Sequence, residues 1–545
     1  KKLILLMCII SYLGIIFSSD FSPEDQENLN YRQIFFRWPQ ISGDSEYELI
    51  ISDSILFSLS DTIAVSSNSY LLEDMLSWNS TYYWKVCKGS SECLPVMSFT
   101  VNPLPLHHSS NINILYLDQD NYEDGINILD CESLGYSLAI DMHGETIWFA
   151  DKYQFNESKI IVTQFLDNGN FIGFSNGIGY EFTIDSEILF QTPVNLNVHH
   201  QISKTDNSTY FLLDAEIEYH DCPNECDEEF SYFPVPWQGD RFVEISETGE
   251  ILWMWDTFQK ISLDEYNPYY ASTYNGTIEF DWTHSNSLLF DPISNSVLAS
   301  IRNLSRITSI DYDTGETNWS IGKSEFMQNP DFENEIDMSQ QHSAQLTDEG
   351  NLILFDNGRF QNPEVSRCLE VEFNYENEPF IAWEHVLPDS LFTGSRGECD
   401  RLQNGNTLIT AGRTGHIIEV NNENELIWHL KVTDNHNNDI SVYRTERVKD
   451  LYPENFSYEI EGLTGLYPNF SLTNTGLINC VINNMSWALD SLEFQLKDMD
   501  SNIVLSGKLA LDSSVVNYQI DIDNISTYDS LTYNLSFISN NNNNN

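Results

Sequence analysis

The chain of 545 residues is 41% hydrophobic and 13% aromatic, which is enough for more than one domain with a substantial core. Its 83 acidic residues against 25 Lys and Arg give a net charge of −58, which excludes nucleic acid and an anionic membrane as partners. Gly, Asn, Ser, Thr and Tyr are plentiful and helical periodicity is scarce, so we expect a nearly all-β protein.

Residues 1–19 have the composition of a secretory signal peptide, because Lys1 and Lys2 precede an apolar run over residues 3–17. A membrane anchor is the alternative, but the run is short for a bilayer span. We therefore expect a protein that is secreted, periplasmic or on the cell surface, without membrane contact once the signal is removed.

The cysteine content also indicates an oxidising compartment, since removal of the signal leaves eight cysteines. Sequence proximity suggests two local pairs and one link between neighbouring repeats, namely Cys87 with Cys93, Cys222 with Cys226, and Cys368 with Cys399. Cys131 and Cys480 are left over. A metal site at His220, Cys222 and Cys226 is the alternative for one pair.

Residues 20–104 are expected to form a β-sandwich of the fibronectin type III kind. Its strands are FFRWP (35–39), YELIIS (47–52), TYYWKV (81–86) and SFTV (98–101), with Trp38 and Trp84 as core aromatics. A linker rich in Pro and His ends it before residue 111. The acidic stretch that follows, with Asp118, Asp120 and Asp124, resembles a calcium loop but departs from the EF-hand pattern.

Residues 111–450 contain the same sequence motif six times. The motif, called the repeated phrase below, consists of an apolar strand, an acidic turn, and a second strand that ends in an aromatic residue, usually Trp. The copies span 137–150, 179–190, 242–255, 309–322, 369–383 and 417–430, and their marker aromatics are Trp148, Phe190, Trp253, Trp319, Trp383 and Trp428. Such spacing is typical of propeller blades. We therefore predict a six-bladed β-propeller, closed so that no sheet edge is left free.

A second repeat places a histidine before an apolar strand in three consecutive blades. His200 precedes DNSTYFLL (206–213), His284 precedes ISNSVLAS (293–300), and His342 precedes DEGNLILF (348–355). A single strand histidine is more often a core residue. Three at one position of the blade favour a shared site, because equivalent positions of a propeller surround its axis.

Arginines gather in the same blades, since seven of the twelve lie between Arg302 and Arg413. Guanidinium groups suit oxyanions such as sulfate, phosphate or carboxylate. The alternative pairs them with the abundant carboxylates as structural ion pairs. We expect two or three of them to face the axis.

Residues 451–539 are expected to form a second β-sandwich, because strands alternate there as in SLEFQLKD and NIVLSGKLAL. A C-terminal sorting domain is the alternative. The asparagines at 540–545 are predicted to be a disordered tail.

An ordered set of motifs resembles the arylsulfotransferase family, bacterial enzymes that move a sulfuryl group between phenols without a nucleotide donor. The set is DWTHSNS (281–287), SIRNLSRI (300–307), DTGETNWSIG (313–322), QQHSAQL (340–346), LFDNG (354–358), VSR (365–367) and LQNGNTLI (402–409). The resemblance covers residues 111–447. It implies a six-bladed propeller, a phenolic sulfate donor, a phenol acceptor, and no metal or other cofactor.

The resemblance also implies site residues. His284, His342 and Asn357 match catalytic positions, with Arg359 or Arg367 beside them, and His200, Arg302, Arg396 and Arg401 are expected to bind the substrate. In the family a histidine is transiently sulfated, and the matching position near 390–392 holds none. Either His385 substitutes, or another histidine does the chemistry, or covalent sulfation is lost.

We therefore predict a secreted arylsulfotransferase-like enzyme. Two alternatives stay open: a catalytically silent propeller that binds a sulfated or carboxylated ligand, and a structural or adhesive surface protein whose axial Arg and His are paired internally.

Overall fold

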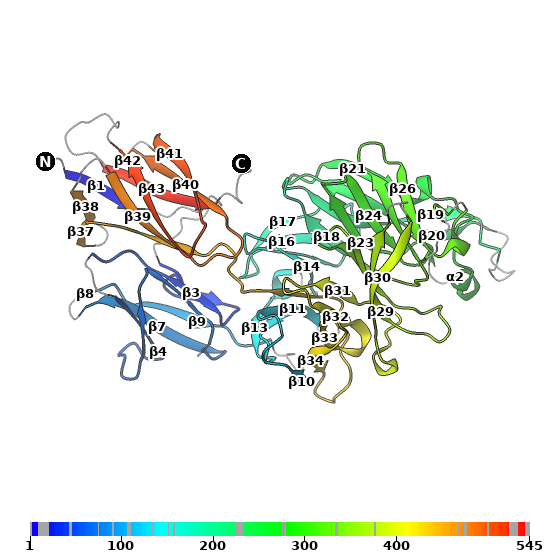
Figure 1. Ribbon diagram of the computed structural model, residues 1–545, viewed down its shortest axis with the longest axis horizontal. Helices are drawn as coiled ribbons and strands as arrows, with labels where there is room; N and C mark the ends of the chain where they lie inside the picture. Colours follow the sequence, from blue (N-terminus) through cyan, green and yellow to red (C-terminus); the bar gives the residue numbers. More distant parts are fainter. Residues whose placement is uncertain are drawn as a thin grey trace. The chain divides into compact units, whose positions relative to one another are not determined.

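The computed structural model is almost entirely β and is drawn in Figure 1. It describes residues 3–8, 21–42, 46–74, 76–89, 92–105, 111–131, 136–150, 152–155, 159–224, 226, 233–274, 276, 279–328, 330–332, 336–374, 378–466, 469–473, 477–498, 501–522 and 532–539. The chain divides into two compact units, one of residues 106–166 and 170–448, and one of residues 1–105, 167–169 and 449–545.

The unit of residues 106–448 consists of six antiparallel sheets, which we call blades 1 to 6. In blade 1 the hydrogen-bonded order of the strands is β13 (Thr146–Phe149), β12 (Tyr136–Ile140), β11 (Ile126–Cys131) and β35 (Thr445–Val448). Blade 2 consists of β14 (Ile161–Phe165), β15 (Phe171–Ser175), β16 (Ile178–Phe182) and β17 (Ile188–Gln191). Blade 3 consists of β18 (Val198–Lys204), β19 (Tyr210–His220), β20 (Val235–Ile245) and β21 (Ile251–Asp256), with β22 (Phe280–Asp281) beside β20.

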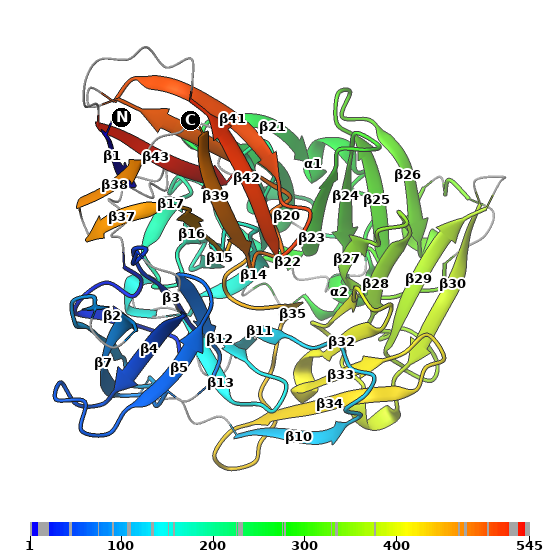
Figure 2. The ribbon, with the colours of Figure 1, turned by 60° about the vertical axis from the view of Figure 1, so that its left-hand side comes forward.

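Blades 4 to 6 repeat this meander, and Figure 2 shows the strands of blades 4 and 5 running side by side. Blade 4 consists of β23 (Ser285–Asp291), β24 (Ser296–Ile301), β25 (Arg306–Asp311) and β26 (Thr317–Gly322). Blade 5 consists of β27 (His342–Leu346), β28 (Leu352–Asp356), β29 (Arg367–Phe373) and β30 (Pro379–Val386). Blade 6 consists of β31 (Glu398–Arg401), β32 (Thr407–Ala411), β33 (His416–Val420), β34 (Leu426–Thr433) and β10 (Asn111–Leu117).

The blades form a ring that is closed by strands from both ends of the unit. Innermost strands of successive blades contact each other, from β14 through β18, β23 and β27 to β31. β35 pairs with β11 in blade 1, and β10 pairs with β34 in blade 6. The prediction of a six-bladed propeller is confirmed, and no blade of the ring lacks a neighbour.

The repeated phrase forms the third and fourth strands of every blade. In all six copies the register between these strands shifts by a β-bulge, as at Ala139/Ile140 in blade 1 and Glu419/Val420 in blade 6. The turn between the strands contains a left-handed residue, such as Gly249 with φ 79° or Gly315 with φ 66°, where glycine avoids strain. The similarity in sequence therefore reflects a similarity in backbone conformation.

The marker aromatics join each blade to the next one. Four indole N–H groups donate to a turn carbonyl of the following blade: Trp148 to Ile184, Trp253 to Tyr312, Trp383 to Asn422, and Trp428 to Met142. The remaining two use ring contacts, with Phe190 stacked 4.1 Å from Tyr210 and Trp319 lying 5.0 Å from Phe373. The bond from Trp428 links blade 6 to blade 1 and completes the circle.

Helices are short and lie between blades 3 and 4: α1 (Thr257–Lys260) and α2 (Pro268–Thr273). Within the described residues, no helix is long and apolar enough to cross a membrane.

The second unit contains two groups of sheets. The N-terminal group pairs β3 (Ile34–Arg37) with β6 (Ser69–Leu72), beside a sheet of β2 (Glu27–Leu29), β9 (Met97–Val101), β7 (Ser80–Lys88), β4 (Tyr47–Ser52), β5 (Asp61–Val65) and β8 (Glu92–Cys93). Trp38 and Trp84 are buried in it, at 1% and 0% exposure. A fibronectin type III domain over residues 20–104 stays a prediction.

The C-terminal group has one core between two sheets. One sheet orders β36 (Phe456–Ile460), β39 (Leu477–Asn484) and β42 (Val515–Asp521). The other orders β37 (Leu463–Leu466), β38 (Asn469–Thr473), β1 (Leu3–Cys8), β43 (Thr532–Ser539), β40 (Ser491–Lys497) and β41 (Ile503–Ala510). Residues 3–8, assigned above to a signal peptide, thus form a strand here. Residues 9–20 and the Asn tail at 540–545 lie outside the described residues.

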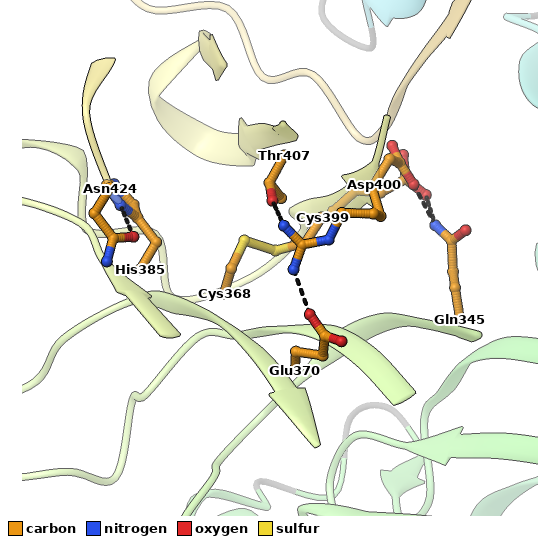
Figure 3. Close-up of a disulfide and its surroundings, with 10 residues drawn as sticks. Gln345, Cys368, Glu370, His385, Cys399, Asp400, Thr407 and Asn424 are labelled. Carbon is orange, nitrogen blue, oxygen red and sulfur yellow. Dashed lines mark hydrogen bonds and ion pairs between the residues drawn. A yellow bond between two sulfur atoms is a disulfide. The ribbon is translucent and has the colours of Figure 1, made fainter. Parts of the chain in front are cut away.

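The three predicted disulfides are confirmed: Cys87 with Cys93, Cys222 with Cys226, and Cys368 with Cys399. The last one joins β29 of blade 5 to β31 of blade 6 (Figure 3). The alternative metal site at Cys222 and Cys226 is wrong, because both sulfurs are used in the disulfide, and His220 contacts Glu218 instead. Within the described ranges, no group of three or more His, Cys, Asp or Glu side chains could hold a metal ion.

Candidate functional site

The structure brings the three repeated histidines together at the innermost strands of blades 3, 4 and 5. His200 lies in β18, His284 directly precedes β23, and His342 begins β27. The rings of His200 and His284 are 4.9 Å apart between centroids. The ring of Tyr443 lies 5.8 Å from His200 and 6.3 Å from His342. We call His200, His284, His342, Tyr443 and Arg302 the axial cluster.

A β-bulge turns the backbone at each of these histidines. The register shifts between the first and second strands in all three blades. His200 and His284 are both left-handed, with φ of 57° and 50°, whereas in blade 5 the left-handed residue is Ser343, with φ 49°. His342 therefore stands one residue earlier than the other two. Bulges of this kind redirect side chains, and here they do so beside the axis.

His284 is oriented by a carboxylate. Its Nδ1 lies 2.7 Å from Oδ2 of Asp281, at the end of β22. Burial would raise the pKa of Asp281, but the neighbouring His284 lowers it below the ordinary value. Asp281 is therefore ionised at neutral pH and accepts a hydrogen bond from the Nδ1–H of His284, which leaves Nε2 of His284 available to a substrate.

His342 uses both ring nitrogens within the protein. Its Nδ1 faces two acceptors, Oδ1 of Asn357 at 2.6 Å and the carbonyl of Gln340 at 3.0 Å, so this nitrogen carries the proton. Its Nε2 accepts from the backbone N–H of Arg396 at 3.2 Å. Asn357 in turn donates to the carbonyls of Thr393 and Arg396. Burial and Arg302 lower the pKa of His342 well below its usual value, so the ring is neutral.

Arg302 is the cation of the cluster and makes no ion pair within the described residues, although it is near enough to Asp281 to help lower the pKa of that carboxyl. Its Nη1 donates to the Tyr270 hydroxyl at 3.1 Å and to Oδ1 of Asn303 at 2.8 Å. Its buried Nε makes no hydrogen bond within the described part of the chain. Tyr270 donates onward to Gln340. A guanidinium without an ion pair can donate hydrogen bonds to an oxyanion.

Residues 111–444 match the sequence model of the arylsulfotransferase (ASST) family. The chain belongs to the arylsulfotransferase family. No curated protein matches it. Similar solved structures include a protein of unknown function from Bacteroides caccae, at 11% identity and TM-score 0.38, covering 59% of this chain and 98% of that one. A virginiamycin B lyase from Staphylococcus aureus has 11% identity and TM-score 0.31 over 59% of this chain and 88% of its own.

The other arginines expected at the arylsulfotransferase site divide into two groups. Arg396 contributes its backbone N–H to His342, and Arg359 donates to the Tyr269 hydroxyl at 3.0 Å, next to Tyr270. Arg367 and Arg401 instead form ion pairs with carboxylates: Arg367 with Asp356 and Glu384 of its own sheet, and Arg401 of blade 6 with Glu370 of blade 5. We therefore do not place these last two among the substrate-binding residues.

His385 does not join the cluster. It lies on β30, the outermost strand of blade 5, and its Nδ1 is 3.0 Å from Oδ1 of Asn424 (Figure 3). Its ring also lies against Trp383, with 6.4 Å between centroids. Of the three alternatives for the sulfated histidine, substitution by His385 is the one that this position on the outermost strand does not favour.

Four residues of the site went unpredicted: Tyr443, Arg444, His199 and Asp240. The Tyr443 hydroxyl is buried without a partner among the described residues, and burial raises its pKa to about 12, so it remains an O–H donor. Arg444 donates to the Gln201 side chain and, at 2.9 Å, to the carbonyl of Asn286, which joins blades 3 and 4. Both residues lie just before β35, outside any repeated motif.

Proposed function

We propose that this protein is a secreted transferase that moves a sulfuryl group from a phenolic sulfate ester to a phenol acceptor. The observation that carries the proposal is Arg302, a buried guanidinium without an ion pair among the described residues, set among three converging histidines. The match to the arylsulfotransferase family supports the reaction class. The three disulfides support an oxidising, extracytoplasmic location.

Each group has a role that its contacts support. Arg302 and the Tyr443 hydroxyl supply donors for the sulfuryl oxygens, whose charge increases in the transition state. His284, oriented by Asp281, takes the proton of the acceptor phenol as its oxygen bonds to sulfur. The bond between sulfur and the donor oxygen breaks, and the donor leaves as its phenolate. No nucleotide, metal or other cofactor enters this scheme.

The test is transfer from 4-nitrophenyl sulfate to a phenol acceptor, followed by the release of 4-nitrophenol. We expect His284→Ala and Arg302→Gln each to lower kcat by about 100-fold or more, in line with the loss of a general base or of a charge-stabilising donor. His385→Ala, on the outer strand, is the matched control and should retain full activity. Full activity in both His284→Ala and His342→Ala would overturn the proposal.

A second candidate function is binding without catalysis. The absence of a histidine at 390–392 favours it, because the family's sulfated residue has no counterpart there. Binding of 4-nitrophenyl sulfate that persists unchanged with a phenol acceptor present would favour this reading. A purely structural role predicts axial arginines in ion pairs with carboxylates, whereas Arg302 has only neutral hydrogen-bond partners among the described residues.

A further inference from the structure

Two consecutive histidines share one proton at the edge of the axial cluster. His199 and His200 both lie in β18, and their Nδ1 atoms are 2.7 Å apart with ring planes at 90°. At that distance one nitrogen donates a hydrogen and the other accepts it. The direction of this hydrogen bond decides which nitrogen of His200 keeps a free lone pair.

Asp240 on β20 sets the direction of the hydrogen bond between His199 and His200. Its Oδ2 accepts from the Thr283 hydroxyl at 2.6 Å and from the Ser285 N–H at 2.7 Å. Its Oδ1 lies 3.1 Å from Nε2 of His199, within ion-pair distance but outside hydrogen-bond geometry, and neither atom has a hydrogen-bond partner among the described residues. Burial would raise the pKa of Asp240, but His199 and these hydrogen bonds lower it overall, so the carboxylate is ionised. An ionised oxygen repels a lone pair, and the proton of His199 therefore resides on Nε2.

The position of the hydrogen on His199 in turn determines which nitrogen of His200 is protonated. In its neutral form, His199 with the hydrogen on Nε2 presents a lone pair at Nδ1, which accepts a hydrogen bond from Nδ1–H of His200. Nε2 of His200 then has a lone pair and, among the described residues, no hydrogen-bond partner. Burial and the neighbouring His284, His199, His342 and Arg302 lower the pKa of His200 well below its usual value and keep the ring neutral.

We infer that Asp240 and His199 are positioning residues that set the tautomer of His200, so that Nε2 of His200 is the reactive lone pair of the axial cluster. His342 is excluded from this role because its Nε2 already accepts from Arg396. His284 is oriented separately by Asp281 and has the role of the proton acceptor.

In the transfer reaction this lone pair attacks sulfur, a step that rests on the proposed function. The N–S bond forms while the bond between sulfur and the donor phenol oxygen breaks, and the phenolate leaves. The acceptor phenol oxygen then attacks sulfur, the N–S bond breaks, and the phenol proton passes to His284. His200 thereby compensates for the histidine that is absent from residues 390–392.

The tautomer is tested without any activity measurement. In protein labelled with 15N-histidine, resonances lost in His200→Gln identify the two ring nitrogens of His200. We expect a protonated Nδ1 and an unprotonated Nε2 in the wild type. Asp240→Asn should reverse them, because its amide N–H donates to Nε2 of His199 and moves that proton to Nδ1. A protonated Nε2 of His200 in the wild type would overturn the inference.

Two activity readouts test the catalytic consequence. Incubation with 4-nitrophenyl sulfate without acceptor, followed by peptide mapping at alkaline pH, should place a sulfuryl group on His200. A sulfuryl group on His284 or His342 instead would refute the assignment. His199→Leu should lower kcat by about tenfold or more, and His199→Asn, which keeps an acceptor oxygen where Nδ1 stood, should restore most of that loss.

The two proposals fail in distinguishable ways. If the wild type transfers sulfuryl groups but the adduct is elsewhere, the assignment of His200 is wrong and the proposed function stands. If the wild type turns over no aryl sulfate, the proposed function is wrong. The 15N spectra still determine the tautomer of His200 in that case. His143→Asn, in an exposed turn of blade 1, is the matched control for both measurements.

Discussion

At the scale of single residues, the inner strands carry buried acids that are held near the protonated state. Burial and Asp400 raise the pKa of Glu398 well above its ordinary value, and burial raises that of Asp400 to about 7. Gln345 donates to Asp400 at 2.6 Å (Figure 3), and Arg444 lies 3.6 Å from Glu398. The strands of blade 6 thus respond to pH in the neutral range.

Asp400→Asn should reduce the dependence of the free energy of unfolding on pH. A pKa raised from about 4 to about 7 contributes stability that is complete below the unfolded value and is lost as pH rises through the folded one. The wild type should therefore lose stability between about pH 5 and about pH 8 relative to Asp400→Asn. Urea unfolding of both proteins across this range measures the difference, and equal pH dependence would contradict the prediction.

Asn357 should matter for both stability and activity, because three of its contacts are buried. Asn357→Leu removes its hydrogen bonds to the carbonyls of Thr393 and Arg396 and to Nδ1 of His342, at a cost of about 1 kcal/mol for each buried hydrogen bond. We expect a lower free energy of unfolding together with a loss of sulfuryl transfer. Asn424→Leu, beside His385 on the outside, is the control and should change little.

The sequence was sufficient to predict which histidines converge, but not how each is oriented. His200, His284 and His342 could be found because they follow a repeat, and Asn357 because it lies in a family motif. His199 and Asp240 could not, since their role depends on a contact between β18 and β20. Tyr443 and Arg444 could not be predicted, because they precede β35, the strand of blade 1 that comes from a distant segment of the chain.

At the scale of elements, neighbouring blades are joined by the marker aromatic side chains, through ring contacts and indole hydrogen bonds. The predicted spacing of these aromatics was sufficient to give the number of blades. The spacing could not show that four of the indoles donate to a turn of the following blade, because the partner carbonyls belong to residues of no fixed type.

Trp428→Phe should destabilise the ring where it closes. The substitution leaves the carbonyl of Met142 without its buried donor, which costs about 1–3 kcal/mol. Trp383→Phe removes the equivalent bond to Asn422 in an exposed position, where water replaces it, and should cost less. Denaturant unfolding of the two variants compares these losses, and a larger loss for Trp383→Phe would show that burial does not govern them.

At the scale of the whole molecule, one covalent bond ties the last two blades together. Cys368 and Cys399 are separated by 31 residues, and a loop of this length corresponds to about 3–4 kcal/mol of stabilisation in the chain-entropy account. The double variant Cys368→Ser with Cys399→Ser should lose about that much. The Cys222–Cys226 pair, separated by 4 residues, closes a shorter loop, and its removal should cost less.

The net charge of −58 should make stability depend on salt. Raising ionic strength from about 0.01 M to about 0.15 M shortens the screening length from about 30 Å to about 8 Å and weakens self-repulsion. We expect the thermal unfolding midpoint to rise with added sodium chloride. A midpoint that falls would mean that screened ion pairs contribute more than the repulsion does.

The strand β35 links the construction of the ring to the order in which the chain is synthesised. Residues 445–448 pair with residues 126–129, more than three hundred positions earlier, and Tyr443 and Arg444 directly precede them. A nascent chain that has reached residue 430 contains all three axial histidines but neither of these side chains, and its first blade lacks its inner strand. The reactive centre is therefore assembled last, only after the ribosome has finished the propeller.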